Sequence, residues 1–194
     1  MVKLIGGNKI RTAVFISGSG SNLKNLIKFS LLKNCPIKII YVVSSNKNAK
    51  GLDHAKKYKI KNQVFEFKRK TEDEDKILKN LKRNKIDLIC LAGFMKILSG
   101  KFIKKSKTTI LNIHPSLLPK YKGLNTHKRV IKNKERYSGC TVHYVNSKLD
   151  SGQIILQKKV KILKSDTPNK LAKKILIQEH LLYPKAIKKL FFSL

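Results

Sequence analysis

The chain has 194 residues, 41% of them hydrophobic, and a formal net charge of +33 at pH 7. This length and composition indicate one globular domain with a full core, and no apolar run is long enough to span a membrane. The charge comes almost entirely from lysine spread along the whole chain, without the aromatic-and-basic motif of an RNA-binding module, so a specific nucleic-acid partner is not expected. The field of these lysines still favours anionic ligands.

The three cysteines, Cys35, Cys90 and Cys140, are far apart and form no CxxC pair. Cys90 and Cys140 stand in apolar or strand-like runs, so buried free thiols are expected. The first eight residues lack the sustained apolar region of a secretory signal. We therefore expect a cytoplasmic protein that forms one domain over residues 1–194, with residues 1–9 as a flexible N-terminal extension.

Strands and helices are predicted to alternate along the first 113 residues. The strands are expected at 10–16, 37–43, 63–67, 87–92 and 108–113, and the helices at 22–33, 50–58 and 71–84. The helix from Thr71 is expected to open with a capping box that ends at Glu74. This alternation predicts an α/β fold with a Rossmann-like, mostly parallel sheet and helices on both faces.

The pattern changes in the second half of the chain. Strands are predicted at 139–145 and 153–160, and the loop between them is too short for a helical crossover, so they should pair antiparallel. Thr167 and Pro168 open a long final helix, with proline in its first turn. The lysine-rich segment 117–137 is expected to form a mobile loop over the site. We therefore expect an antiparallel addition to one mixed sheet.

The first motif that carries chemistry is Ser17-Gly18-Ser19-Gly20-Ser21-Asn22, between a strand and a helix. Two glycines permit a tight turn, and the helix N-terminus offers free N–H groups to an anion. The dinucleotide fingerprint is incomplete, because Leu23 stands where its third glycine belongs. The motif favours a single phosphate over a dinucleotide, and a plain glycine–serine turn is the alternative.

The second motif is Asn112-Ile113-His114, at the end of a predicted strand. Residues two apart share one face of a strand, so Asn112 and His114 should point into one cleft. A catalytic histidine usually has a carboxylate partner. Asp150 can reach the same cleft if the two late strands lie beside this one, and an ordinary turn aspartate is the alternative.

Two further features lie on the expected site. The apolar segment 92–98 follows the strand 87–92, and loops at the carboxyl ends of such strands bind ligands. Its alternative role is to cap the core. On the final helix, Glu179 falls on the apolar stripe that should face the core, where a carboxylate is costly unless it is paired or binds something. Pairing with a lysine is the alternative there.

Taken in order, these motifs resemble the folate-dependent phosphoribosylglycinamide formyltransferase family. The resemblance runs from about Arg11 to the final helix, through the segments 16–23, 91–98, 111–121, 123–127, 141–143, 149–152 and 178–180. Order and spacing make it specific, because Pro-Ser-Leu-Leu-Pro at 115–119 marks only the wider formyltransferase fold. The resemblance implies a single-domain formyltransferase of purine biosynthesis that transfers a formyl group from 10-formyltetrahydrofolate, as co-substrate, to the amine of glycinamide ribonucleotide.

The resemblance also implies roles for individual residues. The implied catalytic residues are Asn112, His114 and Asp150. The implied contacts with the ribonucleotide come from Gly20, Ser21, Asn22 and Glu179, and those with folate from Lys70, Met95, Lys96, Ile97, Leu98 and Asn112. Asn112 and protonated His114 would stabilise a tetrahedral oxyanion, while Asp150 supports His114. No metal is expected, because His127 and His143 do not form a ligand spacing with His114.

Two positions depart from the family pattern, and rivals stay open. Lys70 and Lys96 stand where the family often has arginine, so either Lys70 or the adjacent Arg69 is the folate contact. The methionyl-tRNA formyltransferase would carry a further C-terminal domain and formyltetrahydrofolate deformylase an N-terminal one, and neither is expected here. From another class, a basic RNA-binding module would show salt-sensitive binding that survives loss of His114. A monomer or a homodimer fits the sequence equally.

Overall fold

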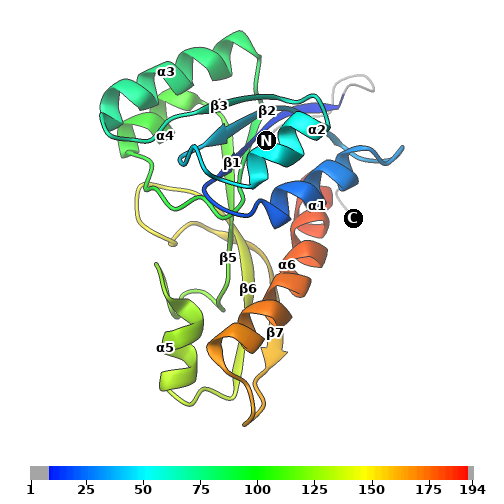
Figure 1. The fold of residues 1–194 in the computed structure, drawn as a ribbon, viewed down its shortest axis with the longest axis vertical. Coiled ribbons are helices and arrows are strands. Elements are labelled where there is room, and N and C mark those ends of the chain that lie inside the picture. The colour runs from blue at the N-terminus through cyan, green and yellow to red at the C-terminus, as the bar shows by residue number, and fades with distance from the viewer. Residues whose placement is uncertain (1–8, 192–194) are drawn as a thin grey trace.

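The computed structural model describes residues 9–191, so the expected flexible extension at 1–9 lies outside the described residues except for Lys9. Strands and helices alternate through this range as predicted (Figure 1). The described strands are β1 Ile10–Ile16, β2 Ile37–Ser44, β3 Lys61–Val64, β4 Leu88–Leu91, β5 Thr109–His114, β6 Tyr137–Tyr144 and β7 Ile154–Lys161. The described helices are α1 Ser21–Ser30, α2 Gly51–Lys57, α3 Lys70–Arg83, α4 Gly100–Ser106, α5 Thr126–Lys132 and α6 Pro168–Phe191.

The strands form one sheet in the order β3-β2-β1-β4-β5-β6-β7. Strands β1 to β5 run parallel, and β6 and β7 add antiparallel beside β5, which confirms the predicted mixed α/β sheet. The chain first winds outward from β1 to β3 and then crosses back to β4. The strand order therefore reverses between β1 and β4, where open α/β sheets bind ligands at the carboxyl ends of the strands.

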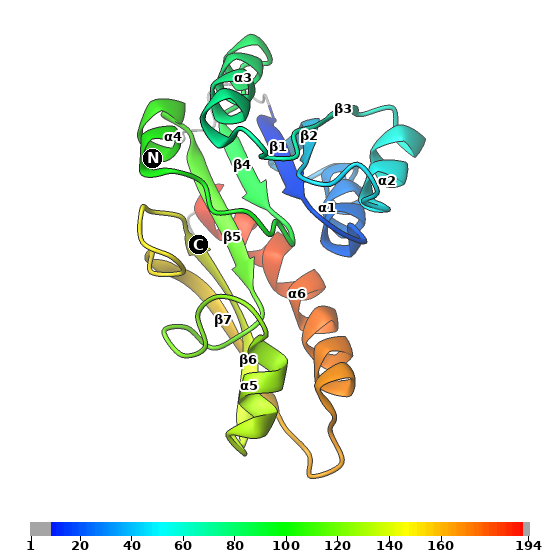
Figure 2. The same cartoon turned by 60° about the vertical axis from the view of Figure 1, so that its left-hand side comes forward.

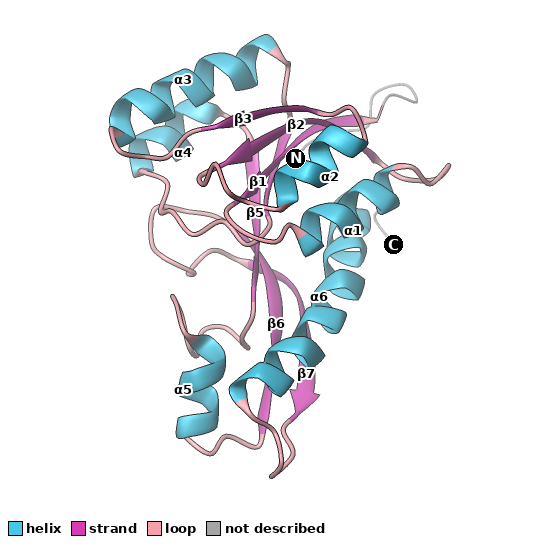
Figure 3. Ribbon diagram, in the orientation of Figure 1, coloured by secondary structure: helices cyan, strands magenta, loops and turns pink. Residues whose placement is uncertain are grey.

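Helices cover both faces of the sheet (Figures 2 and 3). Successive residues of β1 point to opposite faces, as the strand period requires. Val14 and Ile16 pack in a core with residues of α1, α2 and α6, while Ala13 and Phe15 pack in a second core with residues of α3 and α4. The near-continuous apolar sequence of β1 is therefore explained by burial on both sides.

Helix α6 is tied to the two central strands beside the reversal point. The hydroxyl of Tyr183, which is fully buried, lies 3.1 Å from the carbonyl oxygen of Leu91 and 3.2 Å from that of Leu111. Leu91 ends β4, and Leu111 directly precedes Asn112 in β5. The contact holds α6 against the strand ends that lead into the site.

Two local predictions were wrong, and one short helix was not predicted. Helix α3 begins at Lys70 after Arg69, without a side-chain cap, and Thr71 lies inside its first turn rather than capping it. Helix α4 was not predicted, although the Ser99 hydroxyl caps it by accepting from the Phe102 N–H at 3.0 Å. The segment 117–137, expected as a loop, contains α5. Both missed helices have seven residues and many lysines, so they show little apolar periodicity.

The cysteines behave as the sequence indicated. Cys35, Cys90 and Cys140 are all free and buried. Burial raises the pKa of the Cys90 and Cys140 thiols to about 12. These groups are therefore uncharged core side chains at neutral pH.

Candidate active site

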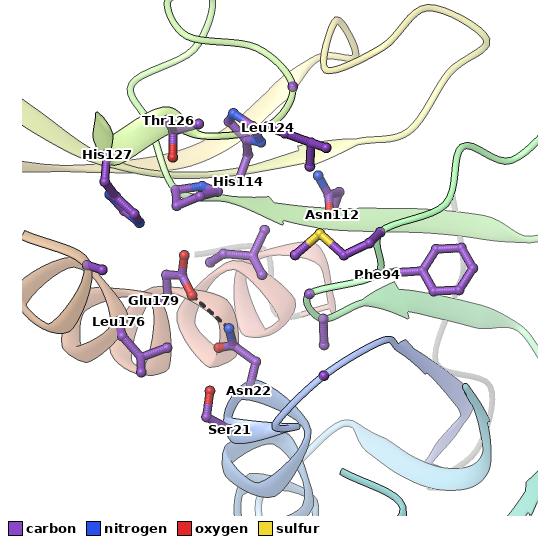
Figure 4. A pocket seen from close by; sticks show the side chains of 18 of the residues that line it. Ser21, Asn22, Phe94, Asn112, His114, Leu124, Thr126, His127, Leu176 and Glu179 are labelled. Atoms are coloured by element: carbon purple, nitrogen blue, oxygen red, sulfur yellow. Dashed lines mark hydrogen bonds between the residues drawn. The ribbon is translucent and has the colours of Figure 1, made fainter. Parts of the chain in front are cut away.

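A pocket of about 690 Å³ opens at the carboxyl ends of the strands, at the reversal between β1 and β4. Six segments line it: the turn after β1, the loop after β4, the end of β5, the segment at the start of α5, the loop after β6, and one face of α6. Figure 4 shows Ser21, Asn22 and Glu179 at one side of this pocket and His114, Asn112 and Leu124 at the other. The motifs singled out in the sequence thus meet around one cavity.

The glycine–serine turn lies at the N-terminus of α1 on the pocket wall. Gly20 precedes the helix with φ 72°, in the left-handed region that favours glycine. A Cβ on Gly20 would lie 2.4 Å from the Cα of Gly51, and the Gly51 N–H donates to the Gly18 carbonyl at 3.1 Å. Sequence reasoning missed Gly51, because its partner glycines are about 30 residues away along the chain and only the fold brings the two backbones together.

Glu179 lies on α6 opposite this turn and is only 7% exposed. The predicted burial of this side chain is confirmed, whereas the alternative of a lysine partner is wrong, since the Asn22 Nδ2 donates to its Oε2 at 2.7 Å. Burial raises the pKa of Glu179 to about 7, and the bond from Asn22 lowers it only in part. The Asn22 Oδ1 is buried and has no hydrogen-bond partner among the described residues. This side of the pocket therefore presents one unsatisfied acceptor beside a buried carboxylate.

Strand pairing explains how Asp150 reaches Asn112 and His114. Strand β6 runs antiparallel beside β5, and the loop after β6 returns to the pocket with Asp150 in it. The Asp150 Oδ2 lies 3.4 Å from the His114 Nδ1 and accepts from the Gly123 N–H at 2.8 Å. Its Oδ1 lies 3.5 Å from the Asn112 Nδ2. The structure therefore brings together the three side chains that the sequence could only suggest as neighbours.

Both ring nitrogens of His114 face oxygen acceptors. Its Nε2 lies 2.8 Å from the Tyr121 carbonyl oxygen, and its Nδ1 faces the Asp150 carboxylate. His114 is 6% exposed. A doubly protonated ring donates from both nitrogens, so this surrounding suits the imidazolium.

His143 is a polar residue of the site that sequence reasoning considered only as a metal ligand. It pairs with Asn112 across β5 and β6, and its Nδ1 lies 2.7 Å from the Tyr144 carbonyl oxygen. That contact places the proton on Nδ1, so the Nε2 accepts from the Asn112 Nδ2 at 3.2 Å. Burial lowers the pKa of His143, which keeps the ring neutral and the Asn112 amide oriented.

The apolar loop after β4 lines the pocket with Met95, Lys96 and Ile97. Met95 is 63% and Ile97 61% exposed, so these side chains do not serve as core caps. Leu98 instead packs in the core below α3 and α4 and does not line the pocket. Lys70, the first residue of α3, also lies outside the pocket lining. Of these five residues of the predicted folate set, three line the pocket, Leu98 packs in the core, and Lys70 lies outside the lining.

Two further observations concern membranes and metals. No helix within residues 9–191 is long and apolar enough to cross a membrane. Across the same described range, histidine, cysteine, aspartate and glutamate side chains form no group of three suited to a metal ion.

His127 lines the pocket beside His114, and burial lowers the pKa of His127.

A pocket at the reversal point of an open α/β sheet, with a buried carboxylate–histidine contact inside it, defines a class of enzyme that acts on small molecules. Comparison with known proteins narrows this class. The family model described as formyl transferase matches residues 10–187. The phosphoribosylglycinamide formyltransferase of Haemophilus influenzae is 43% identical over 181 residues, which cover 92% of this chain and 85% of that protein.

A solved structure gives the same result. The phosphoribosylglycinamide formyltransferase of Anaplasma phagocytophilum is 44% identical, with a TM-score of 0.89, and the match covers 94% of this chain and 87% of that one. The chain therefore belongs to the formyl transferase family and, within it, to the phosphoribosylglycinamide formyltransferases. The trifunctional purine biosynthetic protein adenosine-3 of Gallus gallus is 42% identical over 183 residues, and the matched part is 18% of its length.

Proposed function

We propose that this chain transfers the formyl group of 10-formyltetrahydrofolate to the amine of phosphoribosylglycinamide. The observation that carries the proposal is the convergence of Asn112, His114 and Asp150 in one pocket whose far side is an anion-binding turn. A phosphorylated amine needs both parts, an anion site to hold it and a polar group beside the reacting carbon. Family membership supports the same reaction.

The polar side of the pocket suits the ribonucleotide. Gly20, Ser21 and Asn22 stand at the positive end of the α1 dipole, where backbone N–H groups can hold the phosphate. Glu179 and the unpartnered Asn22 Oδ1 are acceptors suited to ribose hydroxyls. Met95, Lys96 and Ile97, on the opposite side, suit the flat pterin ring. Lys70 or Arg69 is proposed for the charged tail of folate, and the backbone of Leu98 is proposed to contribute to the pterin side of the pocket.

The reaction proceeds through a tetrahedral intermediate. The amine nitrogen attacks the formyl carbon, a new C–N bond forms, and the carbonyl oxygen becomes an oxyanion. The Asn112 amide donates a hydrogen bond to that oxygen, and protonated His114 donates a second one from its Nε2, which leaves the Tyr121 carbonyl oxygen to do so. The intermediate collapses as the bond to the folate nitrogen breaks, the substrate amine loses a proton, and the folate nitrogen gains one, with His114 taking part in these transfers. Asp150 orients His114 and balances its positive charge.

The simplest test is formyl transfer itself. We expect the purified chain to convert 10-formyltetrahydrofolate and phosphoribosylglycinamide to tetrahydrofolate and the formylated ribonucleotide. His114→Ala should lower kcat by roughly 10³-fold, since it removes a proton-transfer group and an oxyanion donor. His54→Ala is the matched control, because His54 lies on α2 outside the pocket lining.

Two results would contradict this assignment. Release of formate without the ribonucleotide would point to a deformylase that uses water in place of the amine. A folded wild-type chain without turnover, but with tight and salt-sensitive RNA binding that His114→Ala leaves unchanged, would point to the RNA-binding alternative.

We further infer a cytoplasmic enzyme of small-molecule substrates, with one formyltransferase domain over residues 1–194 and no metal cofactor or specific nucleic-acid partner. The family match over 10–187 supports the single domain. Three buried free cysteines suit a reducing compartment. The protein is proposed to act as a monomer or a homodimer, which light scattering at working concentration would decide.

A further inference from the structure

The loop at 93–98 is anchored in the core at two positions, because Phe94 makes edge contacts with Phe15 and Phe67 and Leu98 is 6% exposed. Between them Met95 and Ile97 are mostly exposed, and Gly93 adopts φ 72°, so residues 95–97 contribute little packing to their own position. An exposed apolar loop without other support samples many conformations, and ordering it on ligand binding costs free energy. Its backbone contacts are therefore the place to look for what holds it.

One contact lies at the start of the loop. The Met95 N–H donates to the Ser17 Oγ at 2.8 Å, and the Ser17 Oγ lies 2.6 Å from the Ser45 Oγ. Ser17 immediately follows β1 and directly precedes the turn proposed to hold phosphate. A single hydroxyl therefore joins the loop backbone to the opposite side of the pocket.

A second contact lies at the end of the loop. Glu74 of α3 is 5% exposed, and its carboxylate accepts from the Ser99 N–H at 2.8 Å and from the Ser99 Oγ at 2.5 Å. None of the ion pairs among the described residues includes Glu74. A buried carboxylate without a cation is expensive unless hydrogen bonds satisfy it, and here Ser99 supplies them.

We propose that Ser17 and Glu74 are positioning residues for the folate co-substrate, which hold the two ends of the 93–98 loop in the conformation that lines the pocket. The inference rests on the proposed function, because it takes that loop as the folate side of the pocket. Neither residue needs to touch the reacting atoms. Each acts by ordering the loop before the ligand arrives, so that less ordering free energy is lost on binding.

Kinetics with matched variants test this role. Ser17→Ala should raise KM for 10-formyltetrahydrofolate ~5-fold, the effect of one neutral hydrogen bond. Glu74→Gln, which keeps the shape and removes the charge, should raise it roughly 10-fold, since hydrogen bonds to charged groups are stronger. Both variants should change KM for the ribonucleotide and kcat by less than about twofold. Ser17→Thr, which restores the hydroxyl, should recover most of the loss.

The controls use neighbours of the same chemistry. Ser45→Ala removes the hydroxyl next to Ser17 but keeps the acceptor for Met95. Asp75→Asn changes a half-exposed carboxylate on the same helix, whose partner is Lys105. Both should leave KM for the folate close to that of the wild type.

Hydrogen exchange supplies a readout that does not need turnover. In the free protein, Ser17→Ala should accelerate exchange of the Met95 amide, and Glu74→Gln that of the Ser99 amide, while amides of β7 stay unchanged. Binding of tetrahydrofolate by calorimetry should weaken in parallel. A wild type that binds tetrahydrofolate but transfers no formyl group would overturn the proposed function and leave the positioning role supported.

The positioning role is overturned by either of two results. One is unchanged KM for the folate together with unchanged exchange at Met95 and Ser99 in the variants. The other is an equal rise in KM for both substrates, which would show general damage to the fold rather than an effect on the loop.

Discussion

The two sides of the pocket are built in opposite ways. The polar side, formed by Gly18–Asn22 and Glu179, consists of backbone groups and a buried carboxylate in tight contact with their neighbours. The apolar side, formed by residues 93–97, exposes Met95 and Ile97, and it is held by the packing of Phe94 and by the hydrogen bonds of the Met95 and Ser99 N–H groups. The polar side is therefore made rigid by the same groups that face the ligand. The apolar side is made rigid by contacts with residues that do not face the ligand.

The difference teaches where each side is sensitive to substitution. A change at a packed group of the polar side, such as Gly20 or Glu179, should therefore change stability and substrate binding together. A change on the apolar side removes surface that is covered only when a ligand binds, so binding should change while stability does not. Three substitutions test this contrast.

The largest effect is expected for Gly20→Ala. Its Cβ would lie 2.4 Å from the Gly51 Cα in a backbone conformation that L residues rarely adopt. We expect a loss on the order of 3 kcal/mol in the free energy of unfolding, with a higher KM for the ribonucleotide. Urea unfolding measures the first quantity. Gly18→Ala is the control for stability, because a Cβ there meets no atom within 4 Å, and equal losses for the two variants would refute the packing argument.

An intermediate effect that depends on pH is expected for Glu179→Gln. The pKa of Glu179 is raised from 4.5 to about 7 by burial, so its protonated form stabilises the fold below pH 4.5 and that contribution is lost as pH rises through 7. The glutamine variant stays neutral. Relative to the wild type, its stability should therefore rise by up to about 3 kcal/mol between pH 4.5 and 8.

The same variant should bind the ribonucleotide more weakly above pH 7, since it lacks the ionised acceptor for ribose hydroxyls. Thermal unfolding across pH and KM at pH 8 measure the two effects. Glu72→Gln, an exposed carboxylate on α3, is the control. A stability difference that does not change with pH would show that Glu179 is not the titrating group.

The smallest effect on the free protein is expected for Ile97→Ala. Because Ile97 is 61% exposed, its truncation should change the free energy of unfolding by less than about 0.5 kcal/mol. KM for 10-formyltetrahydrofolate should rise about 5-fold, as the covered apolar area is lost. Leu31→Ala, at an equally exposed site on the far end of α1, should change neither quantity. A marked loss of stability in Ile97→Ala would break the contrast between the two sides.

Much of the fold and of the pocket followed from local sequence patterns. The continuous apolar strands, the glycine–serine turn before α1 and the stripe that carries Glu179 each depend on neighbours within one or two turns. The same holds for Asn112 and His114, which share a face because residues two apart on a strand do so. The short lysine-rich helices α4 and α5 were not predicted, because their apolar faces are too small to show a helical period.

The sequence by itself determined the alternation of elements, the antiparallel pair at the end and the residue types that line the pocket. Only the tertiary structure decided which distant groups meet: Asp150 with His114, His143 with Asn112, and Gly51 with Gly20. The tertiary structure also showed that Glu74, expected to cap a helix, instead accepts hydrogen bonds from Ser99. The physical reason is that hydrophobic period and turn chemistry act over a few residues, whereas these contacts depend on strand order and register across the whole sheet.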